Sequence, residues 1–192
     1  MDKPITENDQ GAPELDISVR PEDASSRWST LRENFVEHMF LAEILQEAWF
    51  VRGQQVEVLK AEVDAFGYDL VVECNGVLRH VQLKASEDTG RTSRQTINTT
   101  LARKKGACVV WIVLKPIRET HRLEMTYLFF GGASPHLPMP SLGEVVGVNP
   151  RSKTERPNTR IIKKNQFDPI STTSELLNRM FGERGTTDDE ES

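Results

Sequence analysis

The alternation of apolar and polar residues between positions 67 and 86 predicts a β-hairpin. The stretch is GYDLVVECNGVLRHVQLKAS, and its two runs of Val and Leu flank Asn75 and Gly76. This Asn-Gly pair is a strong signal for a two-residue turn, which sets the register of the two strands so that Cys74 faces Val77. The predicted strands are residues 69–74 and 77–85.

One face of this hairpin collects polar side chains, and the other face is apolar. In the predicted register Asp69 lies across from Gln82, and opposed residues share a face with Cβ atoms about 4.5–5.5 Å apart. Lys84 projects from the same face, two residues beyond Gln82. The opposite face is apolar except for Arg79. We therefore expect one face to join the core and the other to gather an acid, an amide and an amine at one end.

Hydrophobic patterning along the rest of the chain predicts an α/β fold with a central mixed β-sheet flanked by helices. Apolar residues recur at helical spacing up to Phe50, after a capping box formed by Thr30 and Glu33. The continuous apolar run ACVVWIVLK is typical of a buried strand. The aromatic residues expected in the core are Trp49, Trp111, Phe129 and Phe130.

Shorter elements complete the predicted domain. Further strands are expected near residues 56–59 and 122–131, and an edge strand at 159–167. Residues 87–106 are expected to be polar and partly helical, with a helix over 94–106. A proline-rich loop is expected over 133–160 and a terminal helix over 173–181.

The two ends of the chain differ from the middle in composition. Residues 1–25 are polar, rich in proline and acids, and lack periodicity, which predicts a disordered arm, and the acidic residues 183–192 predict a disordered tail. Residues 26–182 are expected to form one domain. No apolar run is long enough for a membrane span, and the N-terminus lacks the apolar run of a secretory signal.

The two cysteines indicate a reducing environment. Cys74 and Cys108 both lie in apolar, strand-like runs, and the chain contains no CxxC pair. A zinc site and a disulfide framework are therefore not expected. We predict two buried thiols and a cytoplasmic protein.

Charge is distributed unevenly along the chain. The formal net charge is −5, yet residues 79–164 hold sixteen Lys and Arg against six Asp and Glu, and residues 1–78 hold six against sixteen. This asymmetry permits a basic surface that binds phosphate groups, with charge balance between neighbouring elements as the alternative. The basic residues after the hairpin, for which a solvated helix face is the alternative, are Arg91, Arg94, Arg103, Lys104 and Lys105. Arg160, Lys163 and Lys164 are interpreted in the same way.

The polar face of the hairpin suits metal-assisted chemistry on a phosphate. A carboxylate such as Asp69 is a hard oxygen ligand for Mg²⁺, and a neighbouring lysine stabilises the charge that develops on a phosphate. Gln82 offers a weaker, carbonyl oxygen. A further acid, Glu37, shares a helical stripe with the apolar Leu41 and Ile44, where an unpaired carboxylate is costly.

The order of a helix acid, GYDLVVE, a turn and VQLKAS resembles the PD-(D/E)XK nuclease superfamily in its Q-x-K variant. The similarity is greatest to small bacterial endonuclease-like domains, and Holliday-junction resolvases and Mrr-like restriction endonucleases are more distant relatives. The proline of the eponymous motif is absent, since Tyr68 precedes Asp69. The resemblance implies a restriction-endonuclease-like core.

The resemblance also implies a site and an activity. Glu37 and Asp69 would hold Mg²⁺, or alternatively Mn²⁺, with help from Gln82, and Lys84 would be the catalytic lysine. The implied activity is hydrolysis of DNA phosphodiester bonds in restriction, repair, recombination or phage defence. Ser86 is a candidate phosphate contact, with a strand-ending hydroxyl as the alternative.

Other functions and partners stay open at this point. The first alternative is a catalytically inactive nuclease-like module that binds nucleic acid or a partner protein, and the second is an RNA-directed nuclease. Because no specificity domain is recognisable, sequence selectivity is expected to be low or to come from a homodimer or a protein partner.

Overall fold

The computed structural model describes residues 26–61, 66–149 and 152–183. The arm predicted for residues 1–25 lies outside the described residues, as does nearly all of the predicted acidic tail. The helical elements are α1 (Ser26–Gln46), its π-helical continuation η1 (Glu47–Arg52), the short turns η2 (Leu101–Arg103) and η3 (Lys164–Gln166), and α2 (Thr173–Phe181). The strands are β1 (Val56–Lys60), β2 (Leu70–Cys74), β3 (Val77–Glu87), β4 (Arg94–Asn98), β5 (Ala107–Ile117), β6 (Arg122–Gly131), β7 (Val146–Val148), β8 (Glu155–Lys163) and β9 (Asp168–Ile170).

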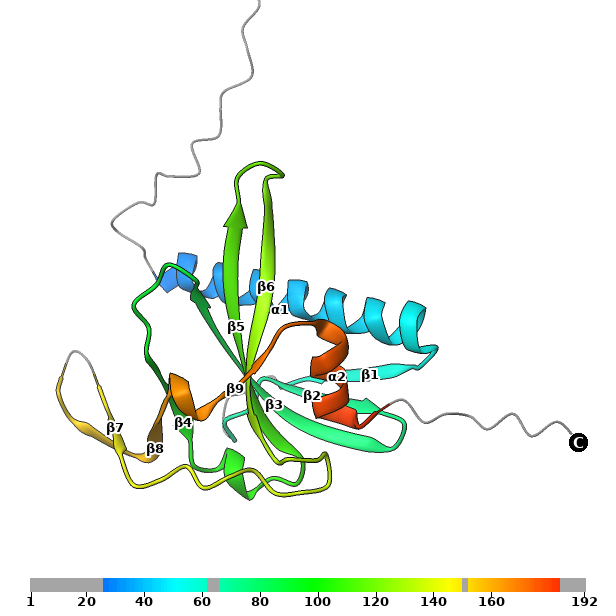
Figure 1. The fold of residues 1–192 in the computed structure, drawn as a ribbon. Coiled ribbons are helices and arrows are strands. Elements are labelled where there is room, and N and C mark those ends of the chain that lie inside the picture. The colour runs from blue at the N-terminus through cyan, green and yellow to red at the C-terminus, as the bar shows by residue number, and fades with distance from the viewer. Residues whose placement is uncertain (1–25, 62–65, 150–151, 184–192) are drawn as a thin grey trace, which may run out of the picture.

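A six-stranded mixed sheet is the centre of the fold. Its strand order is β1-β2-β3-β5-β6-β9, and β3 and β5 are parallel whereas the other neighbours are antiparallel. A second sheet has the order β4-β8-β7 and lies to one side of the large sheet (Figure 1). The α/β class and the central mixed sheet predicted from the sequence are confirmed, and they are consistent with a nuclease-like core.

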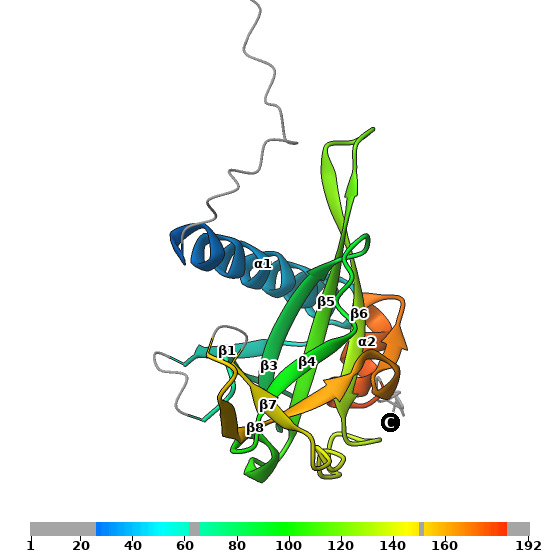
Figure 2. The ribbon, with the colours of Figure 1, turned by 90° about the vertical axis from the view of Figure 1, so that its left-hand side faces the viewer.

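The two faces of the large sheet are covered by different elements. Both helices pack on one face, where Phe40 and Ile44 of α1 and Leu176 of α2 join Leu70 and Val81 in one buried cluster. On the other face, Ile97 of β4 and Ile162 of β8 join Val109 and Trp111 of β5 in a second cluster. Figure 2 shows β4, β7 and β8 on the side of the sheet that faces the viewer. The hairpin is therefore covered by a helix on one face and approached by the small sheet on the other.

The predicted register of the hairpin is confirmed. Cys74 is paired with Val77, and Leu70 is paired with Val81. Asn75 and Gly76 form the turn with φ angles of 52° and 78°. These positive φ values are what a hairpin turn of this type requires, and Asn-Gly is the sequence that adopts them most readily.

The first helix differs from its prediction at both ends. It begins at Ser26, so Thr30 lies inside the helix and the predicted capping box is wrong. Trp111, Phe129 and Phe130 are buried as predicted, but Trp49 is 60% exposed. The physical reason is the π-helical turn at η1, where the helical rotation per residue changes. In this turn Ala48 and Arg52 are the buried residues that face the core, and Trp49 faces solvent.

The predicted helical segment over residues 94–106 is wrong, because Arg94–Asn98 is strand β4 and only Leu101–Arg103 forms a 3₁₀ turn. The predicted edge strand is instead β8, the middle strand of the small sheet, and part of the predicted loop forms β7 and the start of β8. Strands β4 and β8 pair residues that lie more than 60 positions apart, such as Ile97 and Arg160. Local sequence patterns carry little information about such pairings.

Arg79, the one charged residue on the apolar face of the hairpin, is fully buried. It donates a hydrogen bond from Nη1 to the carbonyl oxygen of Pro135 at 3.0 Å, and its guanidinium carbon lies 5.8 Å from the centroid of the Phe129 ring. Cys74 and Cys108 are buried free thiols, as predicted. Burial raises the pKa of the Cys108 thiol, and the adjacent Arg79 guanidinium opposes that rise.

Within the described ranges, no helix is both long enough and apolar enough to cross a membrane.

Candidate active site

The candidate site lies where strands β2 and β3 separate. The registered pairing between them ends at Leu70 and Val81, whereas β3 continues to Glu87 with only β5 beside it. Asp69 stands at the point of separation. Its backbone N–H donates to the carbonyl of Val81 and its carbonyl accepts from the N–H of Ala61, each at 2.9 Å. The backbone of Asp69 is therefore held by both neighbouring strands.

Where backbone hydrogen bonding between β2 and β3 stops, the side chain of Asp69 accepts the next hydrogen bond from β3. Its Oδ2 atom accepts a hydrogen bond from the backbone N–H of Leu83 at 2.6 Å. This bond satisfies a donor that β2 no longer reaches, and hydrogen bonds to a carboxylate are stronger than neutral ones. Asp69 thus links the two strands and places a carboxylate where β3 extends beyond β2.

Gln82 is the most unusual residue of the site. It is only 4% exposed, and within the described part of the chain its Oε1 atom has no hydrogen-bond partner. A buried acceptor without a donor costs free energy, so such groups call for an explanation. A bound cation, or a water attached to one, would supply that missing partner.

Lys84 follows Gln82 on the same face of β3 and is half-buried. Its neighbour across the parallel pair is Trp111 of β5, just as the neighbour of Gln82 is Val109. The described residues provide no hydrogen bond or ion pair to its amine. Within those described residues, Lys84 therefore carries a positive charge without an ion-pair partner, on the face of β3 that the small sheet approaches.

The donors of this site fit a hard divalent cation. Asp69 supplies a carboxylate and Gln82 a buried carbonyl oxygen without a partner, and Mg²⁺ commonly binds through one or two protein oxygens while keeping several waters. The described ranges contain no group of three or more His, Cys, Asp or Glu placed to hold a metal. Carboxylate and amide oxygens are ligands that Mg²⁺ or Mn²⁺ accepts more readily than zinc, which favours Cys and His.

Glu37 occupies a different position from these three residues. Its Oε1 atom lies 2.7 Å from the Nζ atom of Lys60 on β1, and its side chain is 12% exposed. Lys60 is paired with Leu70, whose side chain belongs to the core under α1. The ion pair therefore lies on the helix-covered face of the sheet, whereas Gln82 and Lys84 point to the other face. The role in metal binding that the family resemblance implies for Glu37 stays a prediction.

Ser86 is placed in a buried hydrogen bond. Its Oγ atom accepts from the indole N–H of Trp111 at 2.9 Å, and the serine is 7% exposed. This bond gives the Ser86 hydroxyl a structural role near the end of β3, as the acceptor for the buried indole N–H. The expected phosphate contact of Ser86 stays a prediction.

The predicted basic residues fall into two groups in the fold. Arg94 begins β4 and is paired with Lys163 of β8, so two like charges lie directly across from each other on the small sheet. Lys164 follows immediately, with its Nζ atom 5.8 Å from the centroid of the Trp111 ring, which places it near Lys84. Exposed Arg91 precedes this group in the loop after β3. Like charges across a strand pair are destabilising without a counter-ion, so this group suits an anionic ligand.

The second group lies at the turn η2, at the other end of the polar face. It consists of Arg103, Lys104 and Lys105, and the backbone carbonyl of Lys105 is 2.9 Å from Nδ1 of His80 on β3. Sequence patterns pointed to these charges but missed two aromatic residues beside them, Phe66 and Tyr68. The only local signal for these residues was their place immediately before Asp69.

Comparisons with known proteins give weak similarity. No protein-family model matches the chain, and no curated protein matches it. Among solved structures, one match is a bacterial homing endonuclease with 26% sequence identity and a TM-score of 0.20. The match covers 45% of this chain and 58% of the endonuclease, so the chain spans little more than half of that protein's length.

Proposed function

We propose that this protein is a metal-dependent endonuclease that hydrolyses DNA phosphodiester bonds. The observation that carries this proposal is the buried Oε1 atom of Gln82, which has no hydrogen-bond partner within the described residues. Asp69 accepts a bond from Leu83, the next residue along β3, and Lys84 follows two positions after Gln82 on the same face of that strand. A carboxylate next to a strand that carries a carbonyl oxygen and an ammonium on one face is a donor set for a hard cation and a phosphate. The basic pair of Arg94 and Lys163 on the neighbouring small sheet supports a polyanionic substrate.

Each residue has a separate role in this proposal. Asp69 and Gln82 would hold Mg²⁺ or Mn²⁺, which supplies stabilisation of the negative charge that develops on the phosphate. Lys84 would bind a non-bridging phosphate oxygen and stabilise the charge that grows there as water adds to phosphorus and the bond to the leaving oxygen breaks. The bond from Leu83 to Asp69 would keep the carboxylate in position while substrate binds.

The proposed test measures cleavage of supercoiled plasmid, linear duplex, single strand and a four-way junction with Mg²⁺, Mn²⁺ or EDTA. The wild type is compared with Lys84→Ala and Asp69→Ala, and with Lys115→Ala as a matched control. Lys115 is an exposed lysine on β5 whose amine lies 3.8 Å from the Glu124 carboxylate, outside the candidate site. Circular dichroism establishes that each variant is folded.

The proposal predicts metal-dependent cleavage that is lost in both site variants and retained in Lys115→Ala. Cleavage that survives Lys84→Ala would assign the activity to another site. A folded wild type that binds DNA or RNA without cutting either would favour the inactive nuclease-like module. Cleavage of RNA alone would favour the RNA-directed nuclease.

A further inference from the structure

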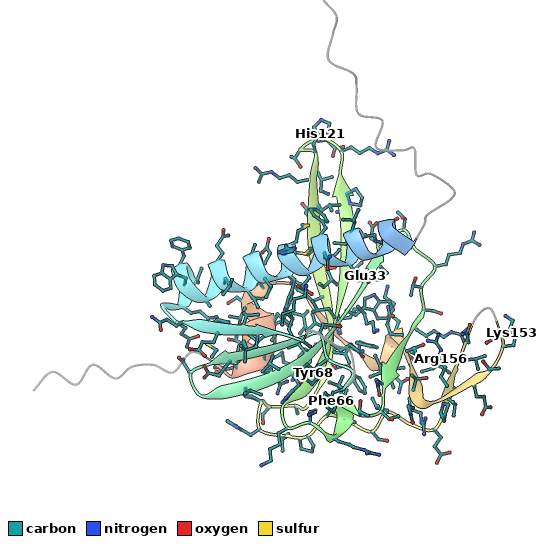
Figure 3. All side chains as sticks on the ribbon, turned by 180° about the vertical axis from the view of Figure 1, so that it is seen from behind. Glu33, Phe66, Tyr68, His121, Lys153 and Arg156 are labelled. Carbon is teal, nitrogen blue, oxygen red and sulfur yellow. The ribbon has the colours of Figure 1, made fainter. Side chains whose placement is uncertain are left out.

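An exposed aromatic and cationic cluster adjoins the candidate active site. The ring of Phe66 is nearly parallel to that of Tyr68, with an interplanar angle of 13° and a centroid separation of 6.4 Å. The Nζ atom of Lys104 lies 4.4 Å from the Phe66 centroid and 5.7 Å from the Tyr68 centroid. Figure 3 shows the two labelled aromatic residues side by side, below α1 in that view. We call Phe66, Tyr68 and Lys104 the aromatic platform.

The inner part of this platform is held firmly. Tyr68 packs against the cluster that contains Trp111 and makes an edge-to-face contact with His80, with centroids 4.9 Å apart. Gly67 between the two aromatic residues is buried with a φ angle of 76°, and a Cβ atom there would lie 2.5 Å from the Cβ of Asn98. Only glycine permits both the positive φ and this close approach. The backbone beneath Phe66 is thus pinned against the end of β4.

The outer part of the platform is open to solvent. Phe66 is 51% exposed although it is a large apolar side chain. A lysine over one ring adds a cation–π attraction, but it leaves much of the aromatic surface in contact with water. An exposed aromatic ring can stack on a nucleobase, and a neighbouring lysine can attract the phosphate of the same nucleotide.

The distance from the platform to the site matches a few nucleotides. Phe66 precedes Asp69 by three residues, so their Cα atoms are at most about 10 Å apart. His80, which touches Tyr68, lies on the same face of β3 as Gln82, about 7 Å along the strand. Successive phosphates of a DNA strand are about 3.4 Å apart along a duplex axis. Lys84 lies two residues further along β3 than Gln82, about 13 Å from His80. A base on Phe66 would therefore belong to a nucleotide several positions from a phosphate at Lys84.

We infer that the aromatic platform stacks an unpaired base, and that the substrate of this enzyme is single-stranded or locally unpaired DNA. This inference rests on the proposed function, because the site beside the platform identifies the ligand as a nucleic acid. Every base inside an intact duplex is already stacked on both faces. A ring such as Phe66 gains a base as its partner only when that base has left the stack.

Equilibrium binding without catalysis is the decisive measurement, with fluorescence anisotropy in EDTA as the readout. The probes are a single strand, its fully paired duplex, and the same duplex with a small unpaired internal loop. The variants are Phe66→Leu, which keeps an apolar side chain of similar size, and Phe50→Leu as a matched control. Phe50 is an exposed phenylalanine on η1, outside the platform.

We expect Phe66→Leu to weaken binding of the single strand and of the looped duplex about tenfold, and to leave binding of the paired duplex unchanged. Phe50→Leu should change none of the three affinities. Equal affinity of Phe66→Leu and wild type for the single strand would overturn the inference, as would an equal loss for all three probes. Absence of binding to every probe would also overturn it.

These outcomes separate the two proposals. If cleavage depends on Lys84 but Phe66→Leu binds single-stranded DNA as tightly as the wild type, the proposed nuclease activity stands and base stacking on the aromatic platform is ruled out. If the protein prefers unpaired DNA through Phe66 but does not cleave it, base stacking on the aromatic platform stands and the nuclease activity is ruled out. Gly67→Ala gives a second, independent check. Its added Cβ would meet the Asn98 side chain and displace the backbone next to Phe66, so it should weaken binding of unpaired DNA while the Phe66 side chain is still present.

Discussion

The two faces of strand β3 are built on different principles, although their residues alternate along one stretch of chain. On the face under α1, Val81 is fully buried in the same cluster as Leu70 and Phe40, and Leu83 packs against it. On the other face, the buried Oε1 atom of Gln82 has no hydrogen-bond partner within the described residues, and Lys84 is half-buried. Val81 and Leu83 stabilise the fold, whereas the Gln82 oxygen costs free energy.

This difference separates residues that stabilise the protein from residues that are retained in spite of their cost. A buried acceptor without a donor costs about 1–3 kcal/mol. Functional sites are where proteins commonly tolerate such costs. Substitution of Leu70 should therefore lower stability, whereas substitution of Gln82 or Lys84 should lower activity without lowering stability.

The largest expected effect is on the helix-covered face. Leu70→Ala would remove a fully buried side chain from the core and leave a cavity. We expect the free energy of unfolding to fall by about 2–5 kcal/mol, as measured by urea denaturation. A loss below 1 kcal/mol would mean that the core under α1 is less tightly packed than its burial indicates.

Lys84→Met should lower the cleavage rate without lowering stability, unlike Leu70→Ala. The methionine keeps most of the length of the side chain and removes its charge, so we expect cleavage to slow about a hundredfold or more while stability is unchanged or slightly higher. Single-turnover cleavage assays and thermal denaturation measure the two quantities. Equal losses of activity and stability would assign Lys84 a structural role instead.

Gln82→Leu tests the unpartnered oxygen directly. Removal of a buried acceptor without a donor should raise the free energy of unfolding by about 1 kcal/mol in EDTA. Addition of Mg²⁺ should raise the melting temperature of the wild type, because a ligand that binds only the folded state stabilises it, and should affect the variant less. A variant that is less stable than the wild type in EDTA would contradict this account.

Ser86→Ala examines the end of the polar face. It would leave the buried indole N–H of Trp111 without an acceptor, so we expect a loss of about 1–2 kcal/mol in stability. If the hydroxyl also contacts phosphate, DNA binding would weaken in Ser86→Ala and would be unaffected by Trp111→Phe. A double-mutant cycle for stability isolates the hydrogen bond from the packing of the indole ring.

The smallest effect is expected for Glu37→Gln. Its partner Lys60 is largely exposed, and ion pairs of this kind contribute about 1 kcal/mol or less. Because the pair lies on the helix-covered face, we expect the cleavage rate to stay within a fewfold of the wild type. A hundredfold loss would bring Glu37 into the metal site, as the family resemblance implies.

Several features followed from local sequence alone. The Asn-Gly turn sets the register of the hairpin. Strand alternation places Gln82 and Lys84 on one face of β3 without any help from distant residues. The continuous apolar run predicted the buried strand β5, and helical spacing predicted the core stripe of α1. These predictions succeeded because strand alternation and helical periodicity are local properties of the chain.

Tertiary structure decided the rest. The pairing of β4 with β8 overrode a helical pattern, and it brought Arg94 and Lys163 together across more than 60 residues. The π-helical turn at η1 left Trp49 exposed, and the approach of β1 to α1 joined Lys60 to Glu37. Phe66 and Lys104 meet only because Gly67 packs against the end of β4. Each of these contacts depends on distant segments, and the sequence does not encode their relative positions in any local pattern.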